Sequence, residues 1–122
     1  MNLDDGPVVA FERLFKTRCD GTEVAIPVEW FVPQSDAQDW SCAYVIRWPD
    51  RHHSHGRAYG VDGLQAVQMA QAKVALELYG AEPPVYWLEE NDRLGLYLVP
   101  LMRDLEDGRK TAWEDVECLK PK

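Results

Sequence analysis

The chain's three histidines stand together in the run Arg51-His52-His53-Ser54-His55, and imidazole nitrogens are common ligands of zinc and other transition metals. His53 and His55 would share one side of an extended segment. A structural zinc site usually takes four ligands, however, and no second cluster of cysteine or histidine occurs in the sequence. The run also lies between a proline and a glycine, as solvated loop tips do. We therefore expect no resident metal and no cofactor, with His52, His53 and His55 as the weak candidates for a metal site.

Arg47, Arg51 and Arg57 surround this loop and form the one basic patch that the sequence suggests. Guanidinium groups bind phosphates and carboxylates in a forked geometry, so an anion or an acidic partner would suit the patch. The arginines would equally balance the acidic residues of the second half, and that interpretation requires no ligand.

Signatures of nucleophilic or phosphate chemistry are absent from the sequence. There is no Gly-x-Ser-x-Gly elbow, and Cys42 alternates with Trp40 and Tyr44, which predicts a buried thiol. Gly60 and Gly63 precede a predicted helix but lack the lysine of a phosphate-binding loop. We expect a protein that is not an enzyme.

Acidic residues dominate the charge, since 21 Asp and Glu stand against 13 Lys and Arg in 122 residues, a formal net charge of −8. Proteins that hold phosphate backbones need a basic face, so we expect no nucleic-acid partner. The N-terminus is acidic where a signal peptide is basic, and no run of about 18 apolar residues predicts a membrane span. Three cysteines, an odd number, do not suit a disulfide framework. These features predict a single cytoplasmic domain over residues 1–122 with no membrane contact.

Carboxylates are concentrated after residue 88, and such an acidic face suits a basic protein partner as well as plain solubility. Tryptophan is a frequent anchor of protein interfaces. We therefore predict a partner-binding surface in the second half, made of Trp87, Glu89, Glu90, Asp92, Glu106, Asp107, Trp113 and Glu114.

Alternation of apolar and polar residues predicts the strands. Pro27 lacks an amide donor, which places its strand at a sheet edge or at a bulge. Asp20-Gly21 is a turn signal, and Asn91-Asp92 lies at the tip of a predicted hairpin. The alternation points four aromatic residues inward, namely Trp30, Trp40, Tyr44 and Trp48. The predicted strands cover residues 8–17, 24–32, 40–48, 57–60, 85–88 and 94–99.

Asp62 and Gln65 form a capping-box pattern that begins a helix running to about Tyr79, with Gly80 as a natural residue after its end. The apolar stripe of this helix comprises Leu64, Val67, Val74, Ala75 and Leu78.

Gln71 lies near the middle of that stripe, and its partner does not follow from the sequence. Met69 and Leu76 lie off the stripe, so the helix needs a second cover, either the C-terminal segment or another subunit. A second capping pattern, Thr111 with Glu114, favours a short helix over residues 112–119. The sum is an α+β two-layer domain, with a mostly antiparallel sheet of five or six strands packed on one long helix and a short C-terminal helix.

The run Tyr59-Gly60-Val61-Asp62-Gly63-Leu64-Gln65-Ala66 resembles the strand-to-helix junction, YGVD-x-LQA, of a family of small uncharacterised bacterial domains. The resemblance covers about the middle 60 residues and implies a fold but no activity. In size and charge the chain is also similar to immunity proteins of toxin systems, by analogy only.

Three functions remain open. The first is a non-catalytic protein-binding module, most concretely a cytoplasmic immunity protein that blocks a basic toxin by steric and electrostatic occlusion. The second is a homo-oligomeric scaffold or regulator, with a homodimer as its simplest form. The third is a metal- or phosphate-dependent enzyme at the His52–His55 loop.

Overall fold

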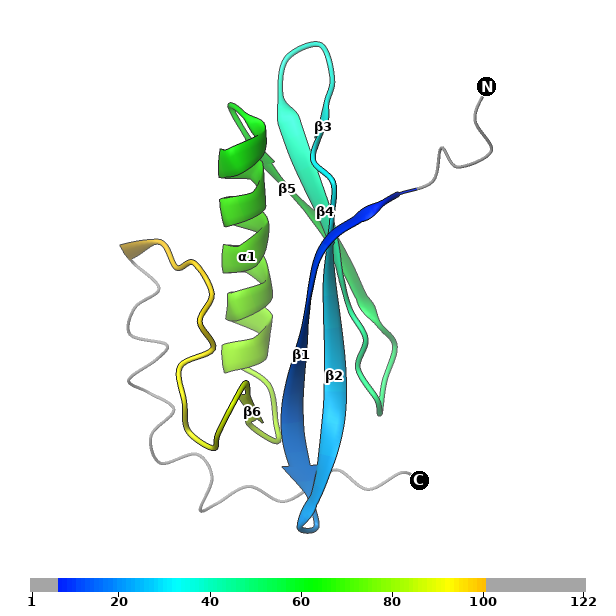
Figure 1. Cartoon of the computed structure of the whole chain (residues 1–122), viewed down its shortest axis with the longest axis vertical. Coiled ribbons are helices and arrows are strands. Elements are labelled where there is room, and N and C mark those ends of the chain that lie inside the picture. Colours follow the sequence, from blue (N-terminus) through cyan, green and yellow to red (C-terminus); the bar gives the residue numbers. More distant parts are fainter. Residues whose placement is uncertain (1–6, 101–122) are drawn as a thin grey trace.

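The computed structural model describes residues 7–100. One helix lies against a twisted, antiparallel sheet (Figure 1), which makes the chain a two-layer α+β domain as its sequence predicts. The elements in chain order are β1 (Val9–Cys19), β2 (Thr22–Phe31), β3 (Gln34–Ser35), β4 (Trp40–Ile46), β5 (Ser54–Gly60), α1 (Gly63–Tyr79) and β6 (Val85–Tyr86).

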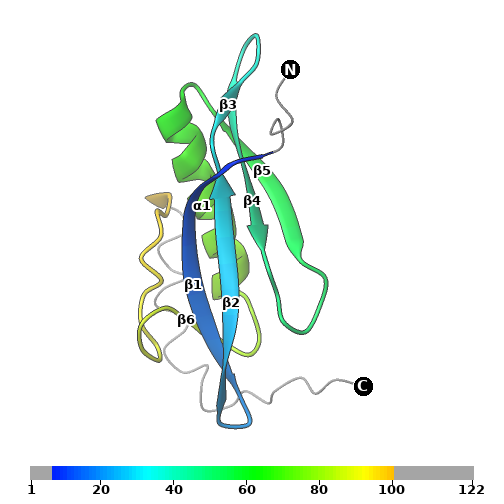
Figure 2. The ribbon, with the colours of Figure 1, turned by 45° about the vertical axis from the view of Figure 1, so that its right-hand side comes forward.

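Within residues 7–100 the sheet has six strands in the order β3-β4-β2-β1-β6, with β5 also paired to β4. β1 and β2 form a long hairpin whose predicted turn is confirmed, since Asp20 and Gly21 take positive φ angles of 53° and 80°. Because neighbouring strands run in opposite directions, β2 ends, β4 begins, β5 ends and α1 begins at one end of the molecule (Figure 2). We call this the apical end.

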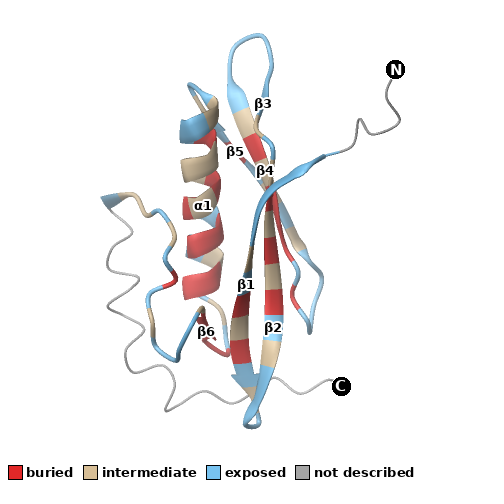
Figure 3. Cartoon of the chain, in the orientation of Figure 1, coloured by how far each residue is buried: buried red, intermediate tan, exposed pale blue. Residues whose placement is uncertain are grey.

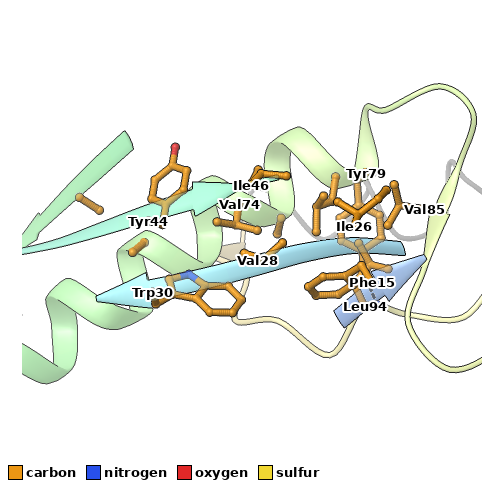
Figure 4. Packing of buried hydrophobic residues seen from close by; sticks show 14 of the residues in the cluster. Phe15, Ile26, Val28, Trp30, Tyr44, Ile46, Val74, Tyr79, Val85 and Leu94 are labelled. Atoms are coloured by element: carbon orange, nitrogen blue, oxygen red, sulfur yellow. Dashed lines mark hydrogen bonds between the residues drawn. The ribbon is translucent and has the colours of Figure 1, made fainter. Parts of the chain in front are cut away.

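α1 covers one face of the sheet, and the core lies between the two layers (Figures 3 and 4). The inward residues of β2 alternate as predicted, with Ile26, Val28 and Trp30 buried. Small helix residues, Ala66, Ala70 and Ala75, are fully buried and let the helix approach the strands closely. The larger buried side chains of the same core cluster include Phe15, Tyr44, Ile46, Val74, Leu78, Val85 and Leu94.

The prediction that Pro27 marks a sheet edge or a bulge is wrong, because β2 is a central strand between β1 and β4 and its pairing with β1 is regular at Pro27. Pairing with β4 covers only Val28–Trp30, so Pro27 lies just beyond that ladder. Its carbonyl accepts a hydrogen bond from the backbone N–H of Arg47, just past the end of β4 (2.9 Å). The missing amide donor therefore interrupts no ladder bond with β4.

The helix bounds are confirmed, but the predicted stripe is wrong at Leu64, which is 70% exposed. Leu64 lies in the first turn, where the start of β4 meets the neighbouring Gly63 through Trp40 and leaves the Leu64 side chain uncovered. Gly80 follows the helix, yet its φ of −90° is not the left-handed conformation that favours glycine.

Gln71 has a partner that explains its position in the stripe. Its side-chain Oε1 accepts a hydrogen bond from the backbone N–H of Tyr97 (3.0 Å), so it anchors the segment after β6 to the helix. Leu96 and Leu98 of that segment, and Met69 of the helix, pack against the core, while Leu76 stays exposed. Residues 94–99 thus provide a second cover for α1.

The predicted hairpin of residues 85–99 is wrong in its second strand. β6 is only two residues long and pairs with Lys16 and Thr17 of β1, and residues 93–99 adopt no strand. The turn itself exists, with Asn91 at a φ of 62°. Buried contacts of Leu94 and the Gln71 hydrogen bond hold the chain on the helix instead of beside β6.

Trp30, Tyr44 and Trp48 are buried as predicted, whereas Trp40 is exposed because it begins β4 at the apical end. Cys42 is fully buried, and that burial raises the pKa of its thiol. The helix predicted over 112–119 lies outside the described residues, as does Cys118. No helix within residues 7–100 is long and apolar enough to cross a membrane.

Candidate interaction surface

Four residues of the predicted acidic surface lie on one turn after β6, namely Trp87, Glu89, Glu90 and Asp92. The other four, Glu106, Asp107, Trp113 and Glu114, lie outside the described residues.

Trp87 is held within the fold. The guanidinium carbon of Arg13 lies 3.7 Å from the centre of the Trp87 ring. The Nη1 group of Arg13 donates hydrogen bonds to the carbonyls of Leu94 and Gly95 (both 3.0 Å). Burial lowers the pKa of this guanidinium. Trp87 therefore forms a structural contact between β1 and the 87–95 segment, and does not project as an anchor.

Asp92 organises the turn. Its carboxylate accepts hydrogen bonds from the backbone N–H groups of Trp87 (3.0 Å), Leu88 (2.7 Å) and Glu89 (3.1 Å). Glu90 forms an ion pair with Arg18 of β1. Two of the three predicted acids on this turn thus have intramolecular contacts, although Glu90 is exposed, as are Leu88, Glu89 and Asn91.

The neighbouring Tyr86 fixes β6 to the hairpin. Its hydroxyl donates to the carboxylate of Glu23 on β2 (2.5 Å), and burial together with this hydrogen bond raises the pKa of Tyr86 to about 12.

The histidine loop forms a broad, open hollow lined by Asp50, Arg51, His52, His53 and His55. His55 belongs to β5, opposite Val45, while His52 and His53 precede the strand. Among the described residues, no group of three histidine, cysteine or acidic side chains is arranged to hold a metal ion.

The arginines that the sequence places around this loop are engaged separately. Arg47 forms a short ion pair with Glu29 (2.6 Å), Arg51 pairs with Asp50 (2.9 Å), and Arg57 donates to the hydroxyl of Ser41 (2.9 Å). Because each guanidinium has its own local partner, the structure does not bring the three together as one anion site.

The junction between β5 and α1 at the apical end is tightly built. Asp62 accepts a hydrogen bond from the backbone N–H of Gln65 (2.8 Å), and Gln65 Oε1 accepts one from the backbone N–H of Val61 (2.8 Å). This confirms the predicted capping box, with Val61 in place of the cap residue as the second donor. A Cβ on Gly60 would lie 2.5 Å from the backbone nitrogen of Ala66, so only glycine fits there.

This rigid junction exposes large apolar side chains. Val61 is 80% exposed and Leu64 70%, one on each side of the capping residue. Trp40 lies beside Gly63, which stands between these two residues in the chain, since its ring is 3.5 Å from where a Cβ on Gly63 would stand. We call Trp40, Val61 and Leu64 the apical patch. Other exposed apolar residues near this end are Val8, Val9, Phe11, Val32 and Tyr59.

Acidic residues border the apical patch. Asp36 and Asp39 lie in the loop before Trp40, and Asp62 lies within the junction. Hydrogen bonds from the backbone N–H groups of Asp39 and Gln38 lower the pKa of Asp36. No described cation forms an ion pair with these three carboxylates. The apical end therefore presents apolar side chains within a negative border.

The sequence did not predict this surface, because helical periodicity assigns Leu64 to the core and the junction motif around Asp62 has a sufficient structural explanation in capping the helix. A signal was present, since Tyr59, Val61 and Leu64 place three large apolar residues within six positions around a helix start. An amphipathic helix needs only its sheet-facing stripe, so the excess apolar residues at its start indicate exposure.

The fold and this surface define a small two-layer α+β domain with an exposed apolar end. The chain belongs to the family described as Domain of unknown function (DUF6968), whose model matches residues 11–98. The strand-to-helix junction lies within that matched range. No curated protein and no solved structure matches the chain.

Proposed function

We propose that the chain is a non-catalytic protein-binding module, and most concretely an immunity protein that blocks a basic toxin through its apical end. The observation that carries the proposal is the exposure of Val61 and Leu64 on a junction fixed by hydrogen bonds at both sides. Rigid apolar side chains bind a partner at low entropic cost, and contiguous exposed apolar surface typically marks an interaction site.

Charge complementarity supports a basic partner. Asp36, Asp39 and Asp62 border the patch, and the whole chain carries a net charge of −8. Such acids steer a positively charged partner toward the surface, while the apolar centre supplies most of the affinity.

The test compares residues of equal exposure at opposite ends. Leu64 is 70% exposed at the apical patch and Leu88 is 69% exposed on the Asp92 turn. The wild-type protein is first used to isolate a partner from the organism that encodes the chain. The affinity of that partner for the wild type and for each of the two glutamate variants is then measured. We expect Leu64→Glu to weaken binding roughly thirtyfold or more and Leu88→Glu to leave it within a factor of three. A larger loss of affinity for Leu88→Glu than for Leu64→Glu would show that the partner binds at the predicted acidic turn and not at the apical patch.

Charge reversal separates the same two surfaces by kinetics. Asp39→Lys is expected to slow association and flatten its dependence on salt, whereas Glu89→Lys is expected to change neither. Both acids are exposed, so neither substitution disturbs the core. An association rate that responds only to Glu89 would contradict an apical interface.

The alternative is a homo-oligomer that buries the apical patch against a second copy. Sedimentation of the purified chain distinguishes the two, since the proposal predicts a monomer and the alternative a dimer that Leu64→Glu dissociates.

A further inference from the structure

At the end of the molecule opposite the apical patch, three segments enclose a pocket of about 200 Å³. The β1–β2 hairpin contributes Thr17 and Ile26, the segment after β4 contributes Trp48 and Arg51, and the chain between α1 and β6 contributes Pro83. Figures 1 and 2 show the loop between β4 and β5 and the chain between α1 and β6 beside the lower half of the β1–β2 hairpin.

The walls of the pocket are fixed by contacts within the fold. The indole N–H of Trp48 donates to the hydroxyl of Ser54 (2.8 Å), and the Arg51 guanidinium lies 4.6 Å from the Trp48 ring centre. Arg51 in turn donates to the Asp50 carboxylate (2.9 and 3.1 Å) and to the carbonyl of Glu82 (3.2 Å). A ligand would therefore meet a preorganised wall.

The polar groups around the pocket already have partners. Asp50 and Arg51 neutralise each other, and the hydroxyl of Thr17 donates to the carbonyl of Pro84 (2.8 Å). Val24, Ile26 and Trp48 give the pocket an apolar lining, with Ile26 only 1% and Trp48 only 6% exposed. A charged ligand would lose its hydration without gaining an unpaired counter-charge, so the lining favours an uncharged one.

We propose that this pocket binds a small uncharged aromatic molecule of one or two rings, about the size of indole. Pockets for drug-sized ligands hold roughly 300–1,000 Å³, so this one fits a ring system without long substituents. The apolar side chains of Val24, Ile26 and Pro83 would pack against such a ring, while the Arg51 guanidinium lies against the Trp48 ring at the wall. The inference is independent of the proposed apical interface, because the two lie at opposite ends of the sheet.

Indole is the probe, and the side-chain Nε1–H signal of Trp48 in ¹H–¹⁵N spectra of the full chain is the readout. We expect saturable shifts at this signal with a dissociation constant on the order of 1 mM or tighter. Benzyl alcohol and benzoate each carry one aromatic ring, but the first is uncharged and the second is an anion. We expect benzoate to bind at least fivefold more weakly than benzyl alcohol. No shift with indole, or tighter binding of benzoate than of benzyl alcohol, overturns the proposal.

Two variants locate the binding. Val24 lines the pocket, so Val24→Phe should fill it and weaken indole binding more than tenfold, while Val32→Phe, exposed and outside the pocket, serves as the matched control. If Val24→Phe does not fold, Arg51→Ala removes the guanidinium from the wall and should weaken binding at least threefold. Indole affinity that the folded pocket variants leave unchanged places the ligand elsewhere and refutes the site.

Discussion

Replacing Gly60 by alanine tests whether the β5–α1 junction is as rigid as the proposed interface requires. The new Cβ would lie 2.5 Å from the backbone nitrogen of Ala66 and 2.8 Å from the carbonyl carbon of Gln65. These atoms belong to the first turn of α1, so no side-chain rotation relieves the contact, and the helix must move by roughly 1 Å. Overpacking of this kind costs about 2–3 kcal/mol.

Gly63 provides the matched control three residues later. A Cβ there would meet Trp40 and Pro33 at 3.5–3.6 Å, which is ordinary contact, and the position begins the helix. We expect Gly63→Ala to stabilise the chain by about 0.5 kcal/mol, through the lower entropy of its unfolded state.

The assay is urea unfolding of the wild type and both variants, followed by circular dichroism. The free energies of unfolding are compared with one common dependence on urea concentration for all three proteins. Gly60→Ala is expected to lower the free energy of unfolding and Gly63→Ala to raise it. If Gly60→Ala lies within 0.5 kcal/mol of the wild type, roughly the scatter of neutral surface changes, the junction adapts and the argument for rigid presentation fails.

Two further predictions concern the region around β6. Burial and the contact with Glu23 raise the pKa of Tyr86 in the folded state to about 12. The protonated hydroxyl therefore contributes its full stabilisation of the fold below a pH of about 10, and this stabilisation is lost as the pH rises to about 12. The stability advantage of the wild type over Tyr86→Phe should shrink by up to about 3 kcal/mol across that window, and a constant difference in pH-dependent unfolding would refute this assignment. Asp92→Ala should lower the free energy of unfolding in urea by about 2–3 kcal/mol, because three backbone N–H groups lose a charged acceptor. Glu89→Ala should change it by less than about 0.5 kcal/mol. Equal effects of the two substitutions would show that the turn does not depend on the Asp92 carboxylate.

The elements that the sequence predicts well are those whose pattern depends on local geometry. Asp20-Gly21 specifies a turn through positive φ, and Asp62 with Gln65 begins the helix through side-chain acceptors of backbone N–H groups. The alternation in β2 was sufficient to place Ile26, Val28 and Trp30 inside.

The predictions that failed depend on where other elements end. Leu64 follows the helical stripe, but the packing of β4 against the helix start leaves its side chain exposed. Pro27 is tolerated in a central strand because the β2–β4 ladder begins one residue later. Local pattern contains neither piece of information, since both depend on how other elements pack and pair in the fold.

The candidate site was predicted least well, because a count of acids does not show which carboxylates the fold uses. Asp92 and Glu90 are acidic in sequence and structural in space. Conversely, Val61 and Leu64 are apolar in sequence and exposed in space. Burial and hydrogen-bond partners decide both cases, and these follow only from the tertiary fold.

The central claim is that the apical end binds a protein partner, and amide hydrogen exchange in the isolated complex tests it most directly. We predict that binding slows exchange around Trp40 and over residues 59–66, while residues 85–92 exchange as in the free chain. Protection confined to residues 85–92, with exchange at the junction unchanged, would contradict the account.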